Sequence, residues 1–159
     1  MKQKELAFWL KFCVIGTAIC GLIIYAAIIP HLFGYVVKNN GMLQANVLPW
    51  LIVIWVSAIP CYGVLVLGWL IADNIGKDNS FSKENAKHLK WVSYLAMIDT
   101  IYFFVVNGIF LLIDKSHPLI MGICFMICFM GIAISVGSAA LSHLVEKASK
   151  IQEENELTI

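Results

Sequence analysis

The chain has 159 residues, of which 60% are hydrophobic and 13% charged, and its formal net charge is +1 at pH 7. This apolar fraction is far above what a soluble domain of this length needs for its core, so the composition excludes an ordinary soluble protein and indicates a membrane protein. A charge near zero gives no general attraction to nucleic acid, and we expect no direct nucleic-acid binding.

Four apolar runs are each long enough to form a transmembrane helix, because a helix needs roughly 20 apolar residues to cross a bilayer core of about 30 Å. They extend over about 12–37, 47–72, 91–113 and 118–145. We therefore predict an all-α protein, an integral membrane four-helix bundle that forms one transmembrane domain over residues 1–159. Residues 73–90 are its central loop and residues 146–159 its tail.

The first apolar run follows three lysines, Lys2, Lys4 and Lys11. A secretory signal peptide is the competing interpretation, since such peptides begin with a basic segment. The apolar core of a signal peptide spans roughly 7–15 residues and precedes an A-x-A-like site, whereas this run is longer and has no such site. We expect a helix that is retained in the membrane.

Lysine determines the expected orientation, because the chain has no arginine. Nine of the eleven lysines lie before the first run, between the second and third, or after the fourth. Lys38 and Lys115 lie on the other side. By the positive-inside rule we expect both termini and the central loop to be cytoplasmic, in a multi-pass protein of a bacterial inner (cytoplasmic) membrane.

The cysteines suggest neither a disulfide framework nor a metal site, because all five fall inside the apolar runs: Cys13, Cys20, Cys61, Cys124 and Cys128. The last two are four residues apart and, with neighbouring methionines, offer soft ligands for copper. Cysteine and methionine also serve as adaptable apolar filler, which is the interpretation we adopt. We expect no metal and no cofactor.

Catalytic motifs are absent from the sequence. It contains no pattern typical of P-loop, α/β-hydrolase, zinc-protease or dinucleotide-binding enzymes. The four histidines lie near the ends of the runs and support a bis-histidine haem only weakly. We therefore expect no enzymatic activity, although intramembrane chemistry built from scattered polar residues leaves no linear motif.

Small residues on the fourth run predict where helices pack. Lipid gives helices no hydrophobic reason to associate, so close contact depends on small side chains and interhelical hydrogen bonds. The residues of this stripe recur at spacings of four, three and four: Gly131, Ser135, Ser138 and Ser142. Thr17 and Gly21 offer a matching pair on the first run. The stripe either holds a tight bundle together or lines a substrate groove, and we adopt the first interpretation.

Asp99 is an acidic residue deep inside the third run. It lies eight residues beyond Trp91, about 12 Å deeper at 1.5 Å per residue, which is too far for so short a side chain to reach the interface. An ionised carboxylate there costs roughly 2.5–3.5 kcal/mol, and the runs contain no lysine or arginine at this depth to pair with it. Burial therefore favours a neutral acid that faces the bundle.

Antiparallel threading of the helices predicts the neighbours of Asp99. The residues at comparable depth complete an expected intramembrane polar site: Thr17, Tyr62, Ser135 and Ser138. Asn107, eight residues further along, extends this polar face. Two interpretations stay open, a structural hydrogen-bond clamp and the titrating group of a proton- or cation-coupled site.

The segments outside the membrane also carry helix signals. Ser82 is a favourable N-cap, whose hydroxyl can accept from the backbone N–H of Glu84 or Asn85. At the other end, Glu146 and Lys150 form an i,i+4 pair on a fourth helix that we expect to extend into the cytoplasm. The acidic tail ends in apolar residues, and it either frays or docks onto the loop lysines or a partner.

Two motifs resemble those of a known family. One lies in the central loop: Phe81, Ser82, Glu84 and Asn85. The other ends the chain: Glu153, Glu154, Asn155, Leu157, Thr158 and Ile159. With them, nearly the whole chain resembles the YoaS-like bacterial membrane proteins, a domain of unknown function numbered 2975. Glu156 departs from the family's ending, which often has aspartate.

The resemblance implies four membrane helices and no established activity. Family members often sit beside genes for small Cro-like helix-turn-helix regulators, which implies a cytoplasmic face that tethers or controls a transcription factor. We therefore expect a non-enzymatic regulatory or binding protein whose partners are the lipid bilayer and a soluble helix-turn-helix regulator, with a homo-oligomer left open. The alternative is a small transporter or proton-coupled membrane sensor that uses Asp99.

Overall fold

A computed structural model describes residues 3–39, 47–113 and 118–156 of the chain. They form helices α1 (Gln3–Ile23), α2 (Ile29–Asn39), α3 (Val47–Gly76), α4 (Lys83–Leu112) and α5 (Pro118–Glu156), with a π-helical stretch η1 (Ile24–Ile28) between α1 and α2. The described residues contain no strand, so the all-helical prediction is confirmed.

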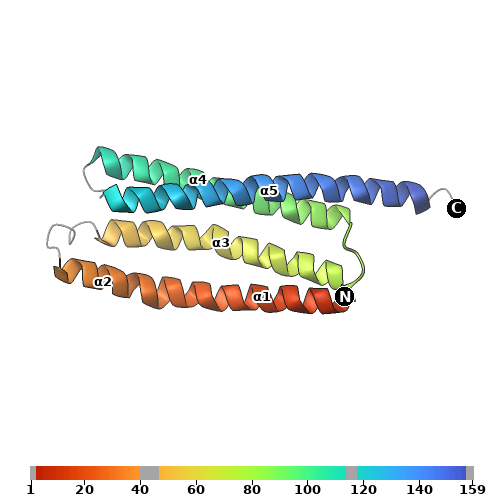
Figure 1. Cartoon of the computed structure of the whole chain (residues 1–159), viewed down its shortest axis with the longest axis horizontal. Helices are drawn as coiled ribbons and strands as arrows, with labels where there is room; N and C mark the ends of the chain where they lie inside the picture. Colours follow the sequence, from red (N-terminus) through yellow and green to blue (C-terminus); the bar gives the residue numbers. More distant parts are fainter. Residues whose placement is uncertain (1–2, 40–46, 114–117, 157–159) are drawn as a thin grey trace.

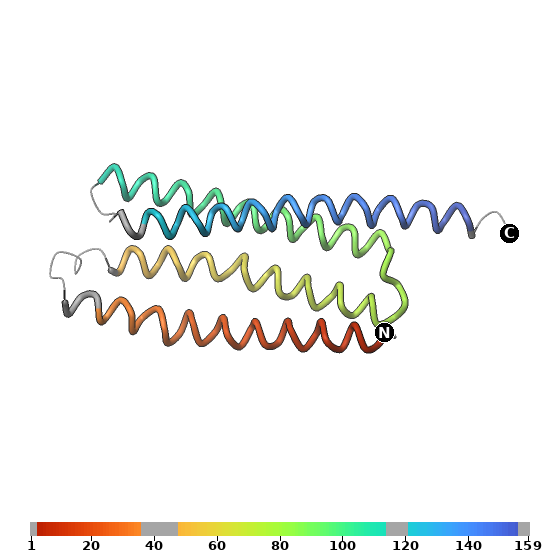
Figure 2. Tube along the Cα trace, in the orientation of Figure 1, coloured from red at the N-terminus to blue at the C-terminus, as the bar shows by residue number. Residues whose placement is uncertain are grey.

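Four long helical rods result, because α1, η1 and α2 follow one another without interruption (Figure 1). Each rod is long and apolar enough to cross a membrane, over Gln3–Tyr35, Leu48–Gly76, Lys83–Leu112 and Met121–Asn155. The start of α1 and the 77–82 loop between α3 and α4 lie at one end of the molecule, which we call the loop end (Figure 2). There α5 runs past the ends of the other helices (Figure 1).

The π-helical stretch lies just before Pro30. Pro30 has no N–H, and its ring would clash with the carbonyl four residues back in a regular α-helix. Just before it, the Ile29 N–H donates to the Ile24 carbonyl, a bond over five residues that widens the helix. The first rod therefore accommodates Pro30 without a break.

The helices pack in chain order and leave the bundle open. Within the described residues, the backbones of α1 and α3, of α3 and α4, and of α4 and α5 approach each other closely, whereas the backbone of α1 approaches neither α4 nor α5, and that of α3 does not approach α5. The central pair is therefore α3 and α4, with α1 and α5 on the outside. The predicted bundle is thus an open one, because the described backbones of its outer helices do not approach each other.

The α4–α5 seam is the most extensive contact between helices. On each helix, small or polar residues at a spacing of seven are buried there: Ala86, Ser93, Thr100 and Asn107 on α4, and Cys128, Ser135, Ser142 and Ser149 on α5. A seven-residue spacing is typical of two helices that cross at about 20° and stay in contact over their length. Small side chains let the two backbones approach closely.

Hydrogen bonds fix the register of this seam. Ser135 Oγ donates to the Ser93 carbonyl over 2.9 Å, and the two serine hydroxyls lie 3.1 Å apart. At the next position of the seven-residue spacing on α5, Ser142 Oγ donates to the Ala86 carbonyl over 2.7 Å. Gly131, Ser135 and Ser142 therefore pack against α4. The expected match with Thr17 and Gly21 of the first run is wrong, because the described backbone of α1 does not approach α5 and Gly21 lies against Tyr62 of α3.

Gly131 tests how closely the seam is packed. A Cβ added there would collide with Thr100 Oγ1, which itself donates to the Ala96 carbonyl over 2.7 Å. We expect Gly131→Ala to lower the free energy of unfolding by about 1–3 kcal/mol, the usual cost of overpacking a tight contact. Unfolding in detergent micelles, followed by circular dichroism, measures the loss.

Gly137 on the same helix provides the matched control, since a Cβ there meets nothing within 4 Å. Gly137→Ala should leave stability unchanged or slightly raised, because alanine favours the helix over glycine. Adding Thr100→Ala to Gly131→Ala should recover part of the loss, because it removes the colliding oxygen. Equal stability of the two single glycine variants would contradict the close contact.

Candidate functional site

The Asp99 carboxyl group is held from α3. Ser57 Oγ donates to Asp99 Oδ2 over 3.0 Å, and the Cys61 thiol, one turn along α3, lies 3.9 Å from the same oxygen. Ser57 is only 3% exposed. The second oxygen, Asp99 Oδ1, is buried and has no hydrogen-bond partner in the described structure. One oxygen of the acid is therefore satisfied within the protein and the other is not.

Asp99 lies at a cavity of about 520 Å³ whose walls come from all four rods. The outer rods contribute Thr17 from α1 and Met130 from α5, while α3 contributes Tyr62. Nearly all the other lining side chains are apolar. This volume falls within the range of about 300–1,000 Å³ that is usual for small-ligand pockets.

The predicted polar site is only partly assembled. Thr17 and Tyr62 line the cavity with Asp99, but they hydrogen-bond elsewhere, Thr17 Oγ1 to the Cys13 carbonyl and Tyr62 OH to the Ala18 carbonyl. Ser135 belongs to the α4–α5 seam, and Ser138 is half-buried on α5. Within the described residues, none of these side chains hydrogen-bonds to Asp99. The hydroxyl group that donates to Asp99 comes from Ser57.

The rotation of α4 explains this difference. Thr100, the next residue, faces α5 in the seam, and consecutive helical residues point about 100° apart. Asp99 is therefore directed toward α3 and away from the serines of α5. Sequence reasoning missed Ser57, although Ser57 and Cys61 are four apart on one face of the neighbouring helix.

Asn107 lies apart from Asp99, inside the α4–α5 seam. It is 8% exposed, and its Nδ2 donates to the Phe103 carbonyl of its own helix over 3.2 Å. Its side-chain oxygen is buried without a described partner. Asn107 is therefore not linked to the Asp99 carboxyl group by the described hydrogen bonds.

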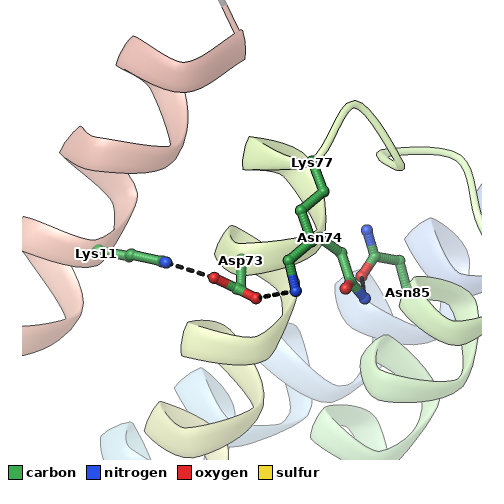
Figure 3. Close-up of polar contacts among 5 residues, drawn as sticks. All are labelled: Lys11, Asp73, Asn74, Lys77 and Asn85. Atoms are coloured by element: carbon green, nitrogen blue, oxygen red, sulfur yellow. Dashed lines mark hydrogen bonds and ion pairs between the residues drawn. The ribbon is translucent and has the colours of Figure 1, made fainter.

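An ion-pair cluster joins the first two rods at the loop end (Figure 3). Asp73 accepts from Lys11 of α1 over 2.6 Å and pairs with Lys77 over 2.7 Å. The hydrogen bond to Asp73, and next the attraction of its charge, raise the pKa of the Lys77 ammonium group above its usual value. Lys11 also lies 4.9 Å from the centre of the Trp69 ring, a cation–π distance.

Asn85 ties the 77–82 loop to both central helices. Its side-chain oxygen accepts from Asn74 Nδ2 over 2.9 Å (Figure 3). Its Nδ2 donates to the carbonyls of Asn79 and Ser80, and Asn85 is 2% exposed. The predicted cap is also confirmed, because Ser82 Oγ accepts from the Asn85 backbone N–H. Asn85 is therefore a buried part of the architecture, not a surface contact.

The remaining motif residues lie at the surface of the loop end. Phe81 is 58% exposed, and Glu84 is exposed beside it. From α5, Glu153 Oε1 pairs with Lys83 Nζ over 2.8 Å, which brings the tail helix against the start of α4. Glu154 and Asn155 are exposed on the same last turns. The side chain of Glu156 and residues Leu157, Thr158 and Ile159 lie outside the described residues.

The polar groups described here do not form a metal site. Among residues 3–39, 47–113 and 118–156 there is no group of three or more histidine, cysteine, aspartate or glutamate side chains that could hold a metal ion. Cys124 and Cys128 are buried in the α4–α5 seam, and Cys128 Sγ lies 3.8 Å from the Thr100 carbonyl. Both cysteines thus contribute to packing.

Comparison with known proteins gives a family and no activity. Residues 31–159 match the family described as "Protein of unknown function (DUF2975)". The chain is 31% identical to the "Uncharacterized membrane protein YoaS" of Bacillus subtilis (strain 168) over 110 residues, which cover 68% of this chain and 69% of that protein. No solved structure matches.

The contacts of Asn85 predict a loss of stability on substitution. Asn85→Ala would leave the Asn74 amide and two loop carbonyls without partners, so we expect the free energy of unfolding to fall by about 1–3 kcal/mol. The 77–82 loop should also be cut faster by protease. Limited proteolysis and unfolding in micelles measure both effects. Lys87→Ala, at an exposed position two residues on, should change neither, and equal behaviour of the two variants would contradict the assigned role.

Proposed function

The chain belongs to the DUF2975 family of proteins of unknown function, and from that premise we propose that it is a non-enzymatic, multi-pass regulatory protein that presents its loop end to a soluble partner. The loop end is then cytoplasmic, in a bacterial inner membrane, with both chain termini on that side. The distribution of lysine supports this orientation.

The observation that carries the proposal is the pair between Lys83 and Glu153. It joins two segments 70 residues apart in the sequence, the start of α4 and the last turns of α5. Both side chains stay largely exposed, at 60% and 52%, so the pair contributes at most about 1 kcal/mol to stability. The pair marks where the α4–α5 seam brings the loop motif beside the last described turns of α5, so that they form one surface.

This surface has the chemistry of a contact for a protein. Phe81 supplies an exposed aromatic side chain, and aromatic residues are enriched in protein interfaces. Glu84 and Glu153 supply exposed acidic groups at the same end of the molecule. The proposed partner is a small helix-turn-helix transcription regulator, which the family resemblance suggests, and the apolar end of the chain at 157–159 completes the contact.

A pull-down from native membranes tests the tail. The intact protein should retain a soluble DNA-binding protein, identified by mass spectrometry, that a variant with Leu157→Ser and Ile159→Ser does not retain. The substitutions keep the length and charge of the tail and remove only its apolar side chains. Retention of the same proteins by both baits would contradict recognition through the tail.

Charge reversal tests the surface itself. Lys83→Glu places a like charge opposite Glu153, and we expect the affinity for the regulator to fall by up to about fivefold, the equivalent of the 0.2–1 kcal/mol of an exposed ion pair. Lys83→Glu with Glu153→Lys restores the pair in reverse and should restore binding. If the double variant binds as weakly as the single one, the ion pair does not organise the surface.

The cavity at Asp99 favours a second candidate, a small transporter or proton-coupled sensor. Asp99→Asn keeps an oxygen that can accept from Ser57, so we expect stability to change little while any proton uptake by the protein in liposomes is lost. A pH-sensitive dye trapped in the vesicles measures the uptake. Proton uptake that is equal in the variant and the intact protein would contradict this candidate.

A further inference from the structure

The intramembrane cavity has a shape that follows from the open bundle. Since the described backbones of α1 and α5 do not approach each other, the residues that they contribute form opposite walls, while α3 and α4 form the floor between them. The cavity therefore lies where a closed four-helix bundle would have its core. A ligand that enters it lies between α1 and α5, whose described backbones do not approach each other.

Among the described residues, the walls carry one acid and no basic group. Asp99 lines the cavity, and the described lining residues include no lysine, arginine or histidine. The carboxyl group is only partly satisfied, by Ser57 and Cys61 on one oxygen. An ionised Asp99 in this position lacks a counter-charge, which a ligand can supply.

The other lining residues favour an apolar body next to a cation. Tyr25, Tyr62 and Phe103 line the cavity, and the faces of aromatic rings attract cations. Met126 and Met130 from α5 line it as well, and methionine adapts to ligands of irregular shape. The remainder of the wall is almost entirely apolar, so a strongly hydrated ion would lose its water without replacement.

We propose that this cavity binds a lipophilic amine, a ligand with one ammonium group beside Asp99 and an apolar body among Phe103, Met126 and Met130. A lipid anion or a fatty acid would bring a like charge toward Asp99, and a neutral lipid would leave the carboxylate without a partner. Charge complementarity therefore selects the amine. The proposal rests on the second candidate function in that it names a ligand for Asp99. It makes a claim about binding and none about transport.

The test is equilibrium dialysis of labelled imipramine, a tricyclic tertiary amine, against the intact protein in phosphatidylcholine nanodiscs. Empty nanodiscs give the amount that partitions into lipid. Iminodibenzyl, the same tricycle without the amine chain, should not displace imipramine. Asp99→Asn should weaken binding at least about tenfold, since it removes the charge and keeps the shape of the side chain.

Two further variants keep the result interpretable. Asp73→Asn removes a carboxylate that does not line the cavity and should leave binding unchanged. Ala96→Leu fills the cavity from α4 without touching the charge and should also weaken binding, which tests the location if Asp99→Asn fails to fold.

Three results would overturn the inference: no binding above that of empty nanodiscs, equal binding by Asp99→Asn, or displacement by iminodibenzyl as effective as by imipramine itself. The last would identify a purely apolar cavity. Proton uptake that depends on Asp99 without imipramine binding would overturn the ligand and leave the second candidate function standing. Imipramine binding without proton uptake would support the ligand and contradict the second candidate function.

Discussion

The close approach of α4 and α5 is the constraint on which the rest of the structure depends. In lipid, apolar side chains gain nothing by leaving the bilayer for one another, so two helices stay together through packing and hydrogen bonds. Ser93 and Ser135 meet in this seam, and Gly131 leaves room for Thr100. Because the seam fixes the rotation of α4, it also directs Asp99 toward Ser57 of α3.

The seam also links the two regions for which we propose functions. Near its middle, Thr100 lies in the contact with Gly131 and also in the wall of the cavity. Toward the loop end, the contact of Ser142 with Ala86 precedes the pair between Lys83 and Glu153. The seam therefore joins the cavity to the loop surface through contacts along α4 and α5.

Sequence alone predicted what depends on local pattern. The Ser82 cap follows from a favourable residue before a helix, and the serine stripe of α5 follows from its spacing. The partner stripe on α4, from Ala86 to Asn107, was not foreseen, because the sequence offered Thr17 and Gly21 of the first run as the match. Ser57 was not foreseen, because its pairing with Asp99 depends on helix rotation, and the burial of Asn85 depends on how the loop turns back.

The packing order has a consequence for how the protein is made. Each described rod contacts the one before it in the chain, and none must wait for a distant segment. Contacts between neighbours in sequence form quickly and with little loss of chain entropy. The protein can thus assemble as its helices leave the ribosome one after another, α3 against α1 and α5 against α4, with the tail helix placed last.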